Sequence, residues 1–482
     1  MTLSKLLENI DIIDVQGNID VKVSGIAFNS QEVKPGDVFV CISGFKTDGH
    51  TYADDALERG AVAIVAEKSL ESIAATVVVV QNTRLALANM AAVYFDHPYR
   101  KFRLIGITGT NGKTTTTYLV KNILESCGQK VGLIGTNQNM IGDEVIPSHH
   151  TTPDSLELMR LFDRMANEKV DSVVMEVSSH SLALDRVASC EFDTGAFTNV
   201  TQDHLDFHET MENYIAAKSQ LFRMCRTGVL NIDDAAFEKM ADQSTCEIIK
   251  YSAEKNEGLF ADNIIYKADG VEFDLSYKGE SVRIELAIPG RFSVYNALTA
   301  AGCCISAGLT LRQIANGFKS ASGVKGRIEV VKTNTDYTVI IDYAHTPDGL
   351  ANILDAIRGF AKGRIVTLFG CGGDRDRTKR PQMGKIAGEK SDFCIVTSDN
   401  PRSEEPSAII EDILVGIKET DCEYKVIENR FEAIEFALDN ARTDDIILLA
   451  GKGHEPYQIL QDRTIVFDER EIVLKLIDSS EG

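Results

Sequence analysis

One stretch constrains the fold of this chain more than any other, the run Leu104-Ile105-Gly106-Ile107-Thr108-Gly109-Thr110-Asn111-Gly112-Lys113-Thr114-Thr115-Thr116-Thr117. A short apolar run, a glycine-rich turn, Gly-Lys-Thr and an amphipathic segment follow one another without a gap, which predicts a strand, a phosphate-binding loop and a helix. Backbone N–H groups of such a loop and the positive end of the helix bind phosphate.

The loop predicts an ATP site with defined roles for its side chains. Lys113 is expected to reach the β- and γ-phosphates, and the hydroxyl of Thr114 to lie at Mg²⁺. The residues predicted to bind ATP here are Gly109, Thr110, Asn111, Gly112, Lys113, Thr114 and Thr115. The common pattern has glycine five positions before Gly112, where this chain has Ile107. The alternative is a glycine-rich turn with an accidental Gly-Lys-Thr, which the order of strand, loop and helix disfavours.

Length and charge exclude several classes of protein. A chain of 482 residues suggests about three domains. The net charge of −22 argues against binding to nucleic acid or to an anionic membrane. No apolar run is long enough to span a membrane, and the N-terminus lacks the apolar core of a signal peptide, so a cytoplasmic protein is expected. The ten cysteines include no Cys-x-x-Cys, which favours reduced thiols without structural zinc.

The chain before the phosphate loop is predicted to be a smaller α/β unit. Its buried-strand candidates are 38–42, 61–65 and 77–80. Between them lie polar stretches at 28–30 and 44–50, which by themselves indicate only solvated turns. His97-Pro98-Tyr99 is the expected linker to the central domain.

The central domain is expected to place functional side chains just beyond strand ends. A helix over 115–127 ends at Gly128, and another is predicted to begin with Thr152 as N-cap and Pro153 in its first turn. Strands are predicted over 170–177 and 192–200, and Glu176 lies at the end of the first. A carboxylate there suits Mg²⁺. His204, beyond the second strand, by itself indicates a capping or core histidine.

From about residue 328 the pattern is that of βαβ units, which predicts a parallel sheet with right-handed crossovers. The expected strands are 339–342, 365–369, 393–397 and 446–449, and the expected helices are 349–360, 407–418 and 431–441. Polar clusters follow the strands at 342–348, 372–377, 399–402 and 451–455. Because the carboxyl ends of parallel strands share one edge, these four loops predict a binding site there.

The motif Thr-Gly-Thr-Asn-Gly-Lys-Thr-Thr at 108–115 resembles that of the Mur ligase family, and motifs along nearly the whole chain agree with it. The resemblance implies ATP-driven amide formation on the peptide of bacterial cell-wall precursors. It further implies addition of meso-2,6-diaminopimelate to UDP-N-acetylmuramoyl-L-alanyl-D-glutamate through an acyl-phosphate. The implied fold is α/β in three domains: an N-terminal UDP-sugar-binding domain (1–97), a central P-loop ATP-binding domain (98–327) and a Rossmann-like C-terminal amino-acid-binding domain (328–482).

The resemblance also implies roles for individual residues. Lys113, Glu176, His204 and Lys218 would be catalytic, and Thr114, Glu176, His204 and Lys218 would hold metal. Lys218, which alone indicates only a solvated surface lysine, would be carbamylated by CO₂. Further ATP contacts would be Asn296, Arg327 and Asp342. The UDP-muramoyl-dipeptide would contact Phe28, Ser30, Phe45, Lys46, Thr47, Thr151, Thr152, Ser178 and Arg186. Diaminopimelate would contact Arg375, Asp399, Asn400, Pro401, Arg402, Gly451 and Glu455. All partners would be small molecules, and the enzyme would be a monomer.

Three alternatives remain open. The first is a member of the family that adds lysine, which lacks one carboxylate of diaminopimelate. The guanidinium groups of Arg402 and Arg375 are suited to bind that carboxylate. A folylpolyglutamate synthetase-like ligase would share the phosphate loop but not the N-terminal unit or Asp399-Asn400-Pro401-Arg402. A P-loop ATPase that is not a ligase would hydrolyse ATP without an amine acceptor and would not need Lys218.

Overall fold

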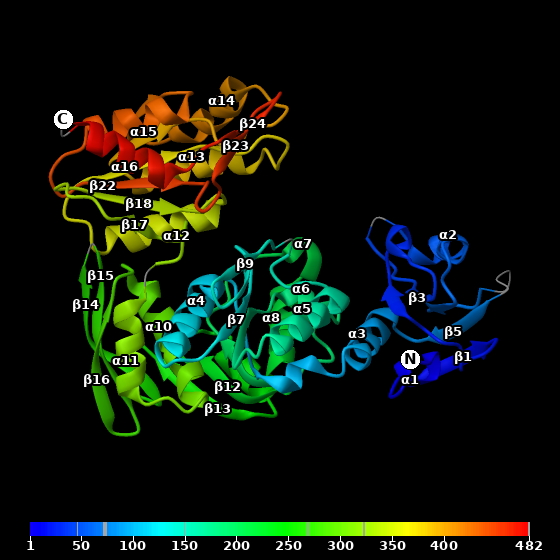
Figure 1. Cartoon of the computed structure of the whole chain (residues 1–482). Helices are drawn as coiled ribbons and strands as arrows, with labels where there is room; N and C mark the ends of the chain where they lie inside the picture. Colours follow the sequence, from blue (N-terminus) through cyan, green and yellow to red (C-terminus); the bar gives the residue numbers. More distant parts are fainter. Residues whose placement is uncertain (46, 71–74, 149, 268, 322, 481–482) are drawn as a thin grey trace. The chain divides into compact units, whose positions relative to one another are not determined.

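The computed structural model describes residues 1–45, 47–70, 75–148, 150–267, 269–321 and 323–480. The chain divides into two compact units. Figure 1 labels their helices and strands. Unit 1 comprises Met1–Tyr251 and Thr299–Leu309, and unit 2 comprises Ser252–Leu298 and Thr310–Gly482. Among the described residues, none of the helices combines the length and apolar character that crossing a bilayer requires.

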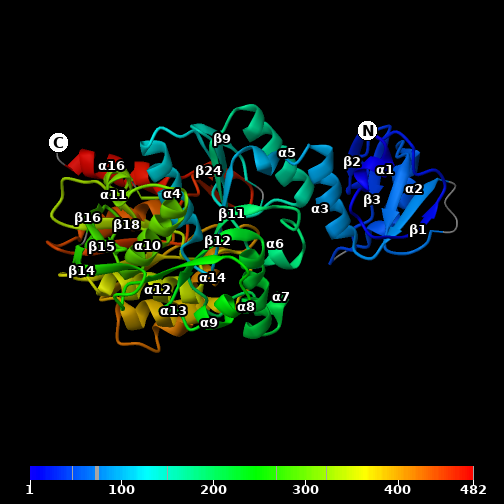
Figure 2. The same ribbon diagram turned by 90° about the horizontal axis from the view of Figure 1, so that it is seen from below.

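Unit 1 begins with a five-stranded sheet of order β1-β5-β4-β3-β2. Its strands are β1 (Ile12–Gln16), β2 (Gly25–Ala27), β3 (Asp37–Val40), β4 (Ala63–Ala66) and β5 (Thr76–Val80). The helices around it are α1 (Leu3–Leu6), α2 (Ala53–Glu58) and α3 (Thr83–Tyr94). Only β1 is antiparallel to its neighbour, and β3, β4 and β5 are buried along their whole length, as the apolar runs predicted. Helix α3 leads from this sheet to the rest of unit 1 (Figure 2).

The second sheet of unit 1 has the order β13-β12-β11-β6-β10-β7-β8-β9. Its strands are β6 (Arg103–Thr108), β7 (Val131–Ile134), β8 (Asn139–Ile141), β9 (Glu144–Ile146), β10 (Ser172–Glu176), β11 (Phe192–Phe197), β12 (Cys225–Asn231) and β13 (Glu247–Ser252). The helices are α4 (Lys113–Ser126), α5 (Ser155–Asn167), α6 (Ser179–Ala183), α7 (Leu205–His208), α8 (Met211–Ser219) and α9 (Phe237–Asp242). The strands from β13 to β7 are parallel, which brings the carboxyl ends of β6, β10 and β11 to one edge.

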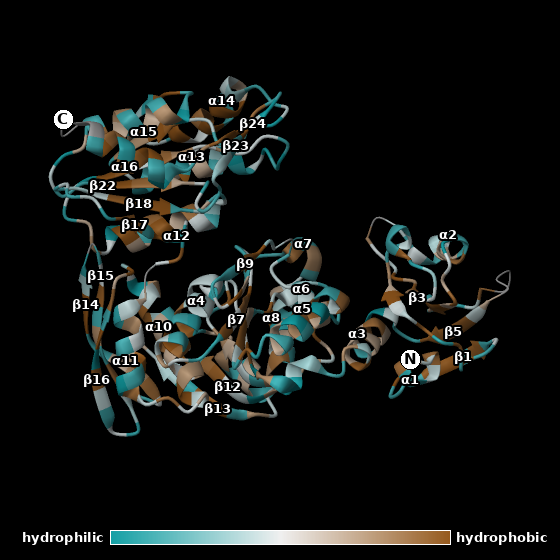
Figure 3. Ribbon diagram, in the orientation of Figure 1, coloured by the Kyte–Doolittle hydropathy of each residue, from teal (hydrophilic) through white to brown (hydrophobic). Residues whose placement is uncertain are grey.

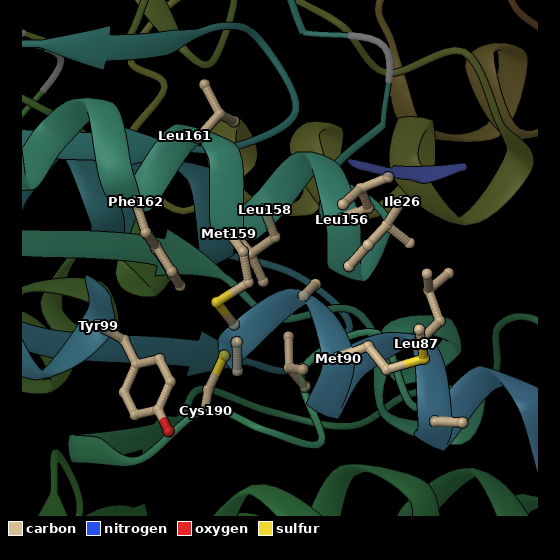
Figure 4. Packing of buried hydrophobic residues seen from close by; sticks show 14 of the residues in the cluster. Ile26, Leu87, Met90, Tyr99, Leu156, Leu158, Met159, Leu161, Phe162 and Cys190 are labelled. Carbon is tan, nitrogen blue, oxygen red and sulfur yellow. The ribbon is translucent and has the colours of Figure 1, made fainter. Parts of the chain in front are cut away.

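One apolar cluster joins the two sheets of unit 1 through α3 and α5. The cluster includes Leu87 and Met90 of α3 together with Leu158, Met159 and Phe162 of α5 (Figure 4). Burial of side chains of this size stabilises the fold by about 1.5–3 kcal/mol each. The packing therefore fixes the N-terminal sheet against the elements that carry Ser178 and Arg186.

Unit 2 contains an antiparallel meander of β14 (Leu259–Lys267), β15 (Gly270–Tyr277) and β16 (Glu280–Leu286). Helix α10 (Arg291–Ser306) follows and belongs to unit 2 as far as Leu298. Helix α11 (Leu311–Ser320) begins with a capping box, in which Thr310 and Gln313 exchange side-chain and backbone hydrogen bonds.

The C-terminal sheet has the order β17-β18-β22-β19-β20-β21 and is parallel except for β17. Its strands are β17 (Glu329–Val331), β18 (Thr338–Asp342), β19 (Ile365–Phe369), β20 (Phe393–Val396), β21 (Glu423–Val426) and β22 (Ile446–Ala450), followed by a hairpin of β23 (Tyr457–Ile459) and β24 (Thr464–Val466). The helices are α12 (Pro347–Arg358), α13 (Lys379–Lys390), α14 (Pro406–Ile417), α15 (Arg430–Asp439) and α16 (Glu469–Ser480). Strands β18 and β22 are largely hydrophobic (Figure 3).

The predicted α/β class and the parallel C-terminal sheet are confirmed. Register pairs Asp342 and Phe369 with Ala450, and Phe369 with Val396, so four strands end at one level. The four polar clusters that follow β18, β19, β20 and β22 therefore share one edge, as predicted. The domain ranges 1–97, 98–327 and 328–482 stay a prediction.

A buried ion pair in unit 2 is predicted to contribute strongly to the stability of the fold. The guanidinium of Arg430 donates from Nε to Glu469 Oε1 at 2.7 Å, and both side chains are almost fully buried. We expect Glu469→Ala to lower the free energy of unfolding by about 3–5 kcal/mol, because it leaves a buried cation without a counter-charge. Lys385→Ala, which removes a solvent-exposed pair with Glu419, should cost at most about 1 kcal/mol. Urea unfolding gives the free energy of unfolding of each variant. Equal losses in the two variants would contradict the predicted role of the buried pair.

Candidate active site

The predicted phosphate loop is present in unit 1. Strand β6 ends at Thr108, and α4 begins at Lys113 immediately after Gly112. Gly109 and Gly112 have positive φ angles of 149° and 84°, which side-chain-bearing residues rarely adopt. A Cβ on Gly109 would also overlap the hydroxyl of Thr198. The loop therefore requires both glycines, although Ile107 replaces the glycine of the common pattern.

Neighbouring residues brace the loop. The N–H of Asn111 donates to Asn199 Oδ1 at 3.0 Å, and the hydroxyl of Thr198 donates to the carbonyl of Asn111 at 2.7 Å. The ammonium of Lys113 folds over the loop and donates to the carbonyls of Gly109 and Thr110 at 2.9 and 2.8 Å. These hydrogen bonds stabilise the conformation of the loop and place the Lys113 side chain against its backbone.

Glu176 lies beside the start of α4. Its carboxylate is buried and accepts from the hydroxyl of Thr114 at 2.9 Å, and from the N–H and hydroxyl of Thr136 at 2.9 and 3.0 Å. Gly135 leaves room for it, since a Cβ there would lie 2.5 Å from Glu176 Oε1. A hydroxyl and a carboxylate at a phosphate loop are suitable ligands for Mg²⁺. The structure thus brings together Thr114 and Glu176, two of the four residues predicted to hold metal, whereas Thr136 was not predicted and lies in no motif.

Lys218 is buried in the same place, on α8. Its ammonium nitrogen lies 2.8 Å from the carbonyl oxygen of Gly109 and 4.3 Å from the ring centroid of Tyr214, and the residue is 1% exposed. The interpretation of Lys218 as a solvated surface lysine is therefore wrong. Burial, followed by the charge of Lys113, lowers the pKa of Lys218 well below its usual value. A larger fraction of the amine is then neutral, which is the form that reacts with CO₂.

His204 lies at the rim of this region. It precedes α7 with a positive φ of 53°, its side chain is 48% exposed, and Nε2 lies 3.3 Å from Asp203 Oδ2. Its ring lies 4.8 Å from that of His180 and 6.3 Å from that of Tyr214. Over the described parts of the chain, no three His, Cys, Asp or Glu side chains form a group that could hold a metal. Any Mg²⁺ would thus need phosphate oxygens, water or a modified Lys218 as additional ligands, which is usual for this ion.

The predicted dipeptide contacts of the central domain form one network. The hydroxyl of Thr152 donates to the carbonyl of Glu176 at 2.8 Å and accepts from the N–H of Ser178 at 3.1 Å. Arg186 donates to the carbonyl of Thr152 at 2.9 Å, and burial lowers the pKa of its guanidinium. The hydroxyl of Thr151 lies 3.1 Å from that of Thr136. The network therefore reaches Glu176.

The prediction that Thr152 caps a helix is wrong. Helix α5 begins at Ser155, and the carboxylate of Asp154 caps it by accepting from the N–H groups of Leu156 and Glu157. Asp154 provides two hydrogen bonds at the helix end, where a negative charge also favours the dipole. Thr152 uses its hydroxyl for the long-range bond to Glu176 instead.

The N-terminal residues predicted for the UDP-sugar have mixed environments. Ser30 is buried, whereas Phe45 is 77% exposed and meets the ring of Phe207 edge-on at 5.7 Å. Phe28 packs partly buried against the core of unit 1. The carbonyl of Thr47 accepts from the N–H of Gly44 at 2.9 Å and closes the loop, while Lys46 lies outside the described residues.

Three predicted ATP contacts lie in unit 2. Asn296 is a buried residue of α10. The Arg327 guanidinium lies over the ring of Tyr343 at 5.1 Å, and its buried Nε has no hydrogen-bond partner among the residues that the structure describes. The carboxylate of Asp342 accepts from the N–H groups of Ile328 and Ala344, both at 2.8 Å, and burial raises its pKa. Asp342 therefore shapes the loop beyond β18.

Arg402 lies in the loop beyond β20 with a positive φ of 52°. Its guanidinium donates to the carbonyls of Gly373 and Asn400 at 2.9 and 3.4 Å. Glu404, two residues beyond Arg402, pairs with Arg380 and Arg377 instead of with Arg402. Within the described ranges, Arg402 has no carboxylate partner in an ion pair. Because carbonyls are neutral, the positive charge of this guanidinium is available to pair with a carboxylate of a ligand.

The remaining amino-acid contacts surround Asn400. Its Nδ2 donates to Glu455 Oε2 at 2.8 Å, and its Oδ1 accepts from Lys452 Nζ at 3.2 Å. Gly451 has a φ of 112°, and a Cβ there would lie 2.7 Å from Asp399 Oδ2, so glycine leaves room for this buried carboxylate. Lys452 is fully buried and was not among the predicted residues. Its position within the polar cluster Gly-Lys-Gly-His-Glu could have indicated it as a site residue.

Arg375 and Pro401 lie in the loops that follow β19 and β20. Arg375 is exposed and donates to the carbonyl of Asp374 at 3.0 Å. Pro401 is buried, and its carbonyl lies against Gly373, where a Cβ would overlap it. The loops beyond β19 and β20 therefore pack backbone to backbone and bring Arg375 and Arg402 to the same edge of the sheet.

Comparison with known proteins identifies the relatives of this chain. The chain matches family models described as Mur ligase family, catalytic domain (22–96), Mur ligase middle domain (107–304) and Mur ligase, glutamate ligase domain (326–453). It is 51% identical to a UDP-N-acetylmuramoyl-L-alanyl-D-glutamate–2,6-diaminopimelate ligase of Caldanaerobacter subterraneus subsp. tengcongensis, covering 97% of each chain. It is 50% identical to the ligase of the same name from Clostridium botulinum, covering 99% of each chain.

A solved structure of a ligase with this name is also similar, at 30% identity and a TM-score of 0.76, covering 100% of this chain and 99% of that one. Identity of this extent over the full length, together with the phosphate loop and the four loops of the C-terminal sheet, assigns the chain to a family. The protein is a member of the Mur ligase family.

Proposed function

We propose that the protein adds meso-2,6-diaminopimelate to UDP-N-acetylmuramoyl-L-alanyl-D-glutamate with ATP, in the synthesis of peptidoglycan precursors. The relatives that carry this name support the substrates. The structural observation that carries the proposal is the buried Lys218, which contacts the phosphate loop at Gly109. An ATPase that only hydrolyses ATP has no need of such a lysine.

The reaction divides into two steps. The terminal carboxylate of the dipeptide attacks the γ-phosphorus of ATP, which gives an acyl-phosphate and ADP. The amine of diaminopimelate then attacks the acyl carbon, an amide forms, and phosphate leaves. The loop N–H groups and Lys113 bind and orient the phosphates, because positioning and electrostatic stabilisation dominate phosphoryl transfer. Arg186 and Ser178 would bind the acidic groups of the dipeptide.

The residues around the phosphate loop fit a bound Mg²⁺. Thr114 and Glu176 would hold it, with His204 and a carbamate on Lys218 as ligands of a second ion. When bound, Mg²⁺ neutralises charge on the phosphoryl oxygens. The neutral amine of Lys218 would attack CO₂ and lose a proton, which gives a carbamate, an anion with two oxygens. Burial lowers the pKa of Lys218, and this supports the carbamate.

Arg402 would select diaminopimelate over lysine. Its guanidinium suits bidentate binding of the carboxylate that lysine lacks. Arg375 would contact the same amino acid from the neighbouring loop. Asp399 and Glu455 would receive an ammonium that both amino acids have, so neither should discriminate between them.

The remaining properties complete the proposal. Asn296, Arg327 and Asp342 would contribute to the ATP site, and Phe28, Ser30, Phe45, Lys46 and Thr47 to the UDP-sugar site. The domains would span 1–97, 98–327 and 328–482. The enzyme would be a cytoplasmic monomer that acts on small molecules and does not bind nucleic acid.

One assay separates the proposed ligase from the alternatives. ADP release is measured with ATP alone, with the UDP-muramoyl-dipeptide added, and with the dipeptide plus each of a panel of amino acids. We expect sustained release only with the dipeptide and meso-2,6-diaminopimelate. Equal release without any amine would favour the simple ATPase. Activity with a folate acceptor and glutamate would favour a folylpolyglutamate synthetase.

We expect Lys113→Ala to lower the rate of ADP release by roughly 10²–10³, because it removes a charge contact worth about 2–4 kcal/mol in the transition state. Lys121→Ala is the matched control, since Lys121 lies on the same helix and pairs with Glu125 away from the loop. Its rate should stay near that of the wild type. A Lys113→Ala enzyme within tenfold of wild type would contradict the assigned role.

A further inference from the structure

We propose that Cys394 and Cys422 form a thiol oxidation site, at which a hydroperoxide converts the two thiols to a disulfide. The site lies in unit 2, between α13, β20 and β21, and its chemistry does not depend on the proposed ligase activity. All ten cysteines are free thiols in the structure.

The two sulfurs are in direct contact. Cys394 is a fully buried residue of β20, and Cys422 comes immediately before β21, which is the edge strand of the sheet. Their Sγ atoms are 3.7 Å apart. Because a disulfide bond is about 2.05 Å long, the sulfurs need to approach by about 1.7 Å. Strand β21 is exposed along its length and pairs with β20, so an edge segment rather than the core would move.

Only one of the two sulfurs is accessible to a small oxidant. Cys422 is half-buried and lines a surface hollow of about 480 Å³. The walls of this hollow come from the end of α13, from Ser391 and Asp392, and from residues 419–423. A hydroperoxide is little larger than water, whose share of liquid volume is about 30 Å³, so it can enter. Cys394, behind Cys422, is placed to resolve the oxidised sulfur.

The surroundings determine which sulfur is the nucleophile. The side-chain hydrogen bond between Cys422 and Cys394 lowers the pKa of the Cys422 thiol, although burial and the charges of Asp392 and Glu423 act in the opposite direction. The charge of Asp392 is partly compensated, since it accepts from the N–H of Ile365 at 2.7 Å and pairs with Arg358 at 2.9 Å. The thiolate is the reactive form of cysteine, so Cys422 reacts first.

The chemistry balances with one hydroperoxide. The Cys422 thiolate attacks the outer oxygen, the O–O bond breaks, and the product is a sulfenic acid and water or an alcohol. The Cys394 sulfur then attacks the sulfenic sulfur, the S–O bond breaks, and the S–S bond forms as water leaves. The two thiols lose two electrons in total, and the hydroperoxide gains both.

The test uses the full-length reduced protein with hydrogen peroxide. After timed exposure, the remaining thiols are alkylated under denaturing conditions and the protein is digested with trypsin. We expect a reducible cross-link between peptide 391–402, which contains Cys394, and peptide 419–425, which contains Cys422. Free Cys422 should disappear at least about tenfold faster than free Cys371, a buried cysteine of the same unit whose sulfur neighbour is Met383.

Two variants separate the roles of the sulfurs. In Cys394→Ala, oxidised Cys422 should persist as a sulfenic acid that dimedone traps. In Cys422→Ser, the cross-link should vanish while Cys394 stays reduced, and this edge substitution decides the question if Cys394→Ala does not fold. Loss of Cys422 no faster than that of Cys371 would overturn the proposal. So would oxidation confined to the other cysteine contact, Cys225 with Cys246, whose peptides are distinct.

Discussion

Replacing Lys218 with alanine is expected to abolish amide formation, with a loss of at least about 10³-fold in rate, while the protein stays folded. The side chain is buried against the phosphate loop and would hold metal as a carbamate. A metal at the transferring phosphoryl group is worth several kcal/mol of charge stabilisation, which corresponds to this loss of rate. Ligation rates of wild type and variant, with thermal unfolding of both, measure the effect.

Chemical rescue tests the carbamate itself. Short carboxylates such as acetate can occupy the space left by the truncated side chain, and we expect them to restore part of the activity of Lys218→Ala. They should not restore Lys113→Ala, because that variant lacks a cation. Wild-type activity should also fall in CO₂-depleted buffer and return with bicarbonate. Full activity of Lys218→Ala without any addition would exclude a metal-bridging role for this residue.

The second large effect concerns the choice of amino acid. We expect the wild type to prefer meso-2,6-diaminopimelate over lysine by roughly 30- to several-thousand-fold in kcat/KM. Lysine would leave the partly buried Arg402 guanidinium without its carboxylate, at a cost of about 2–5 kcal/mol. The structure is consistent with this cost, since Arg402 is held by the carbonyls of Gly373 and Asn400.

Arg402→Ala should remove most of this preference by lowering kcat/KM for diaminopimelate. Arg377→Ala is a matched control, because Arg377 is an exposed guanidinium of the preceding loop that pairs with Glu404. It should retain the preference of the wild type. Measuring kcat/KM for both amino acids in the three enzymes decides the matter, and equal use of lysine by the wild type would refute the role of Arg402.

Contiguous segments were predictable from the sequence. The phosphate loop needs only a strand, two glycines at Gly109 and Gly112, and the helix that begins at Lys113, all within one stretch of chain. The C-terminal sheet was predictable for a related reason. Its strands are separate apolar runs, and parallel pairing places the residues after each run at one edge. The contact of Thr114 with Glu176 follows from the pairing of β6 with β10.

The first residue of a helix was harder to predict from the sequence, because several residues of one segment can serve as its N-cap. In Thr151-Thr152-Pro153-Asp154-Ser155, both Thr152 and Asp154 are capping residues. Asp154 caps α5, whereas the hydroxyl of Thr152 donates a hydrogen bond to the carbonyl of Glu176. No local pattern contains that bond.

The phosphate loop, the parallel C-terminal sheet and the polar loops at its edge all follow from the amino-acid sequence. Which side chains are buried, and what they contact, depends on how distant segments pack. Lys218 is a buried amine because α8 places it against Gly109 of the phosphate loop, where burial and the charge of Lys113 lower its pKa. Arg402 does not pair with Glu404, because Arg380 binds that carboxylate instead. The physical reason is that backbone geometry follows neighbouring residues, whereas desolvation and the choice among charged partners depend on segments far apart in the chain.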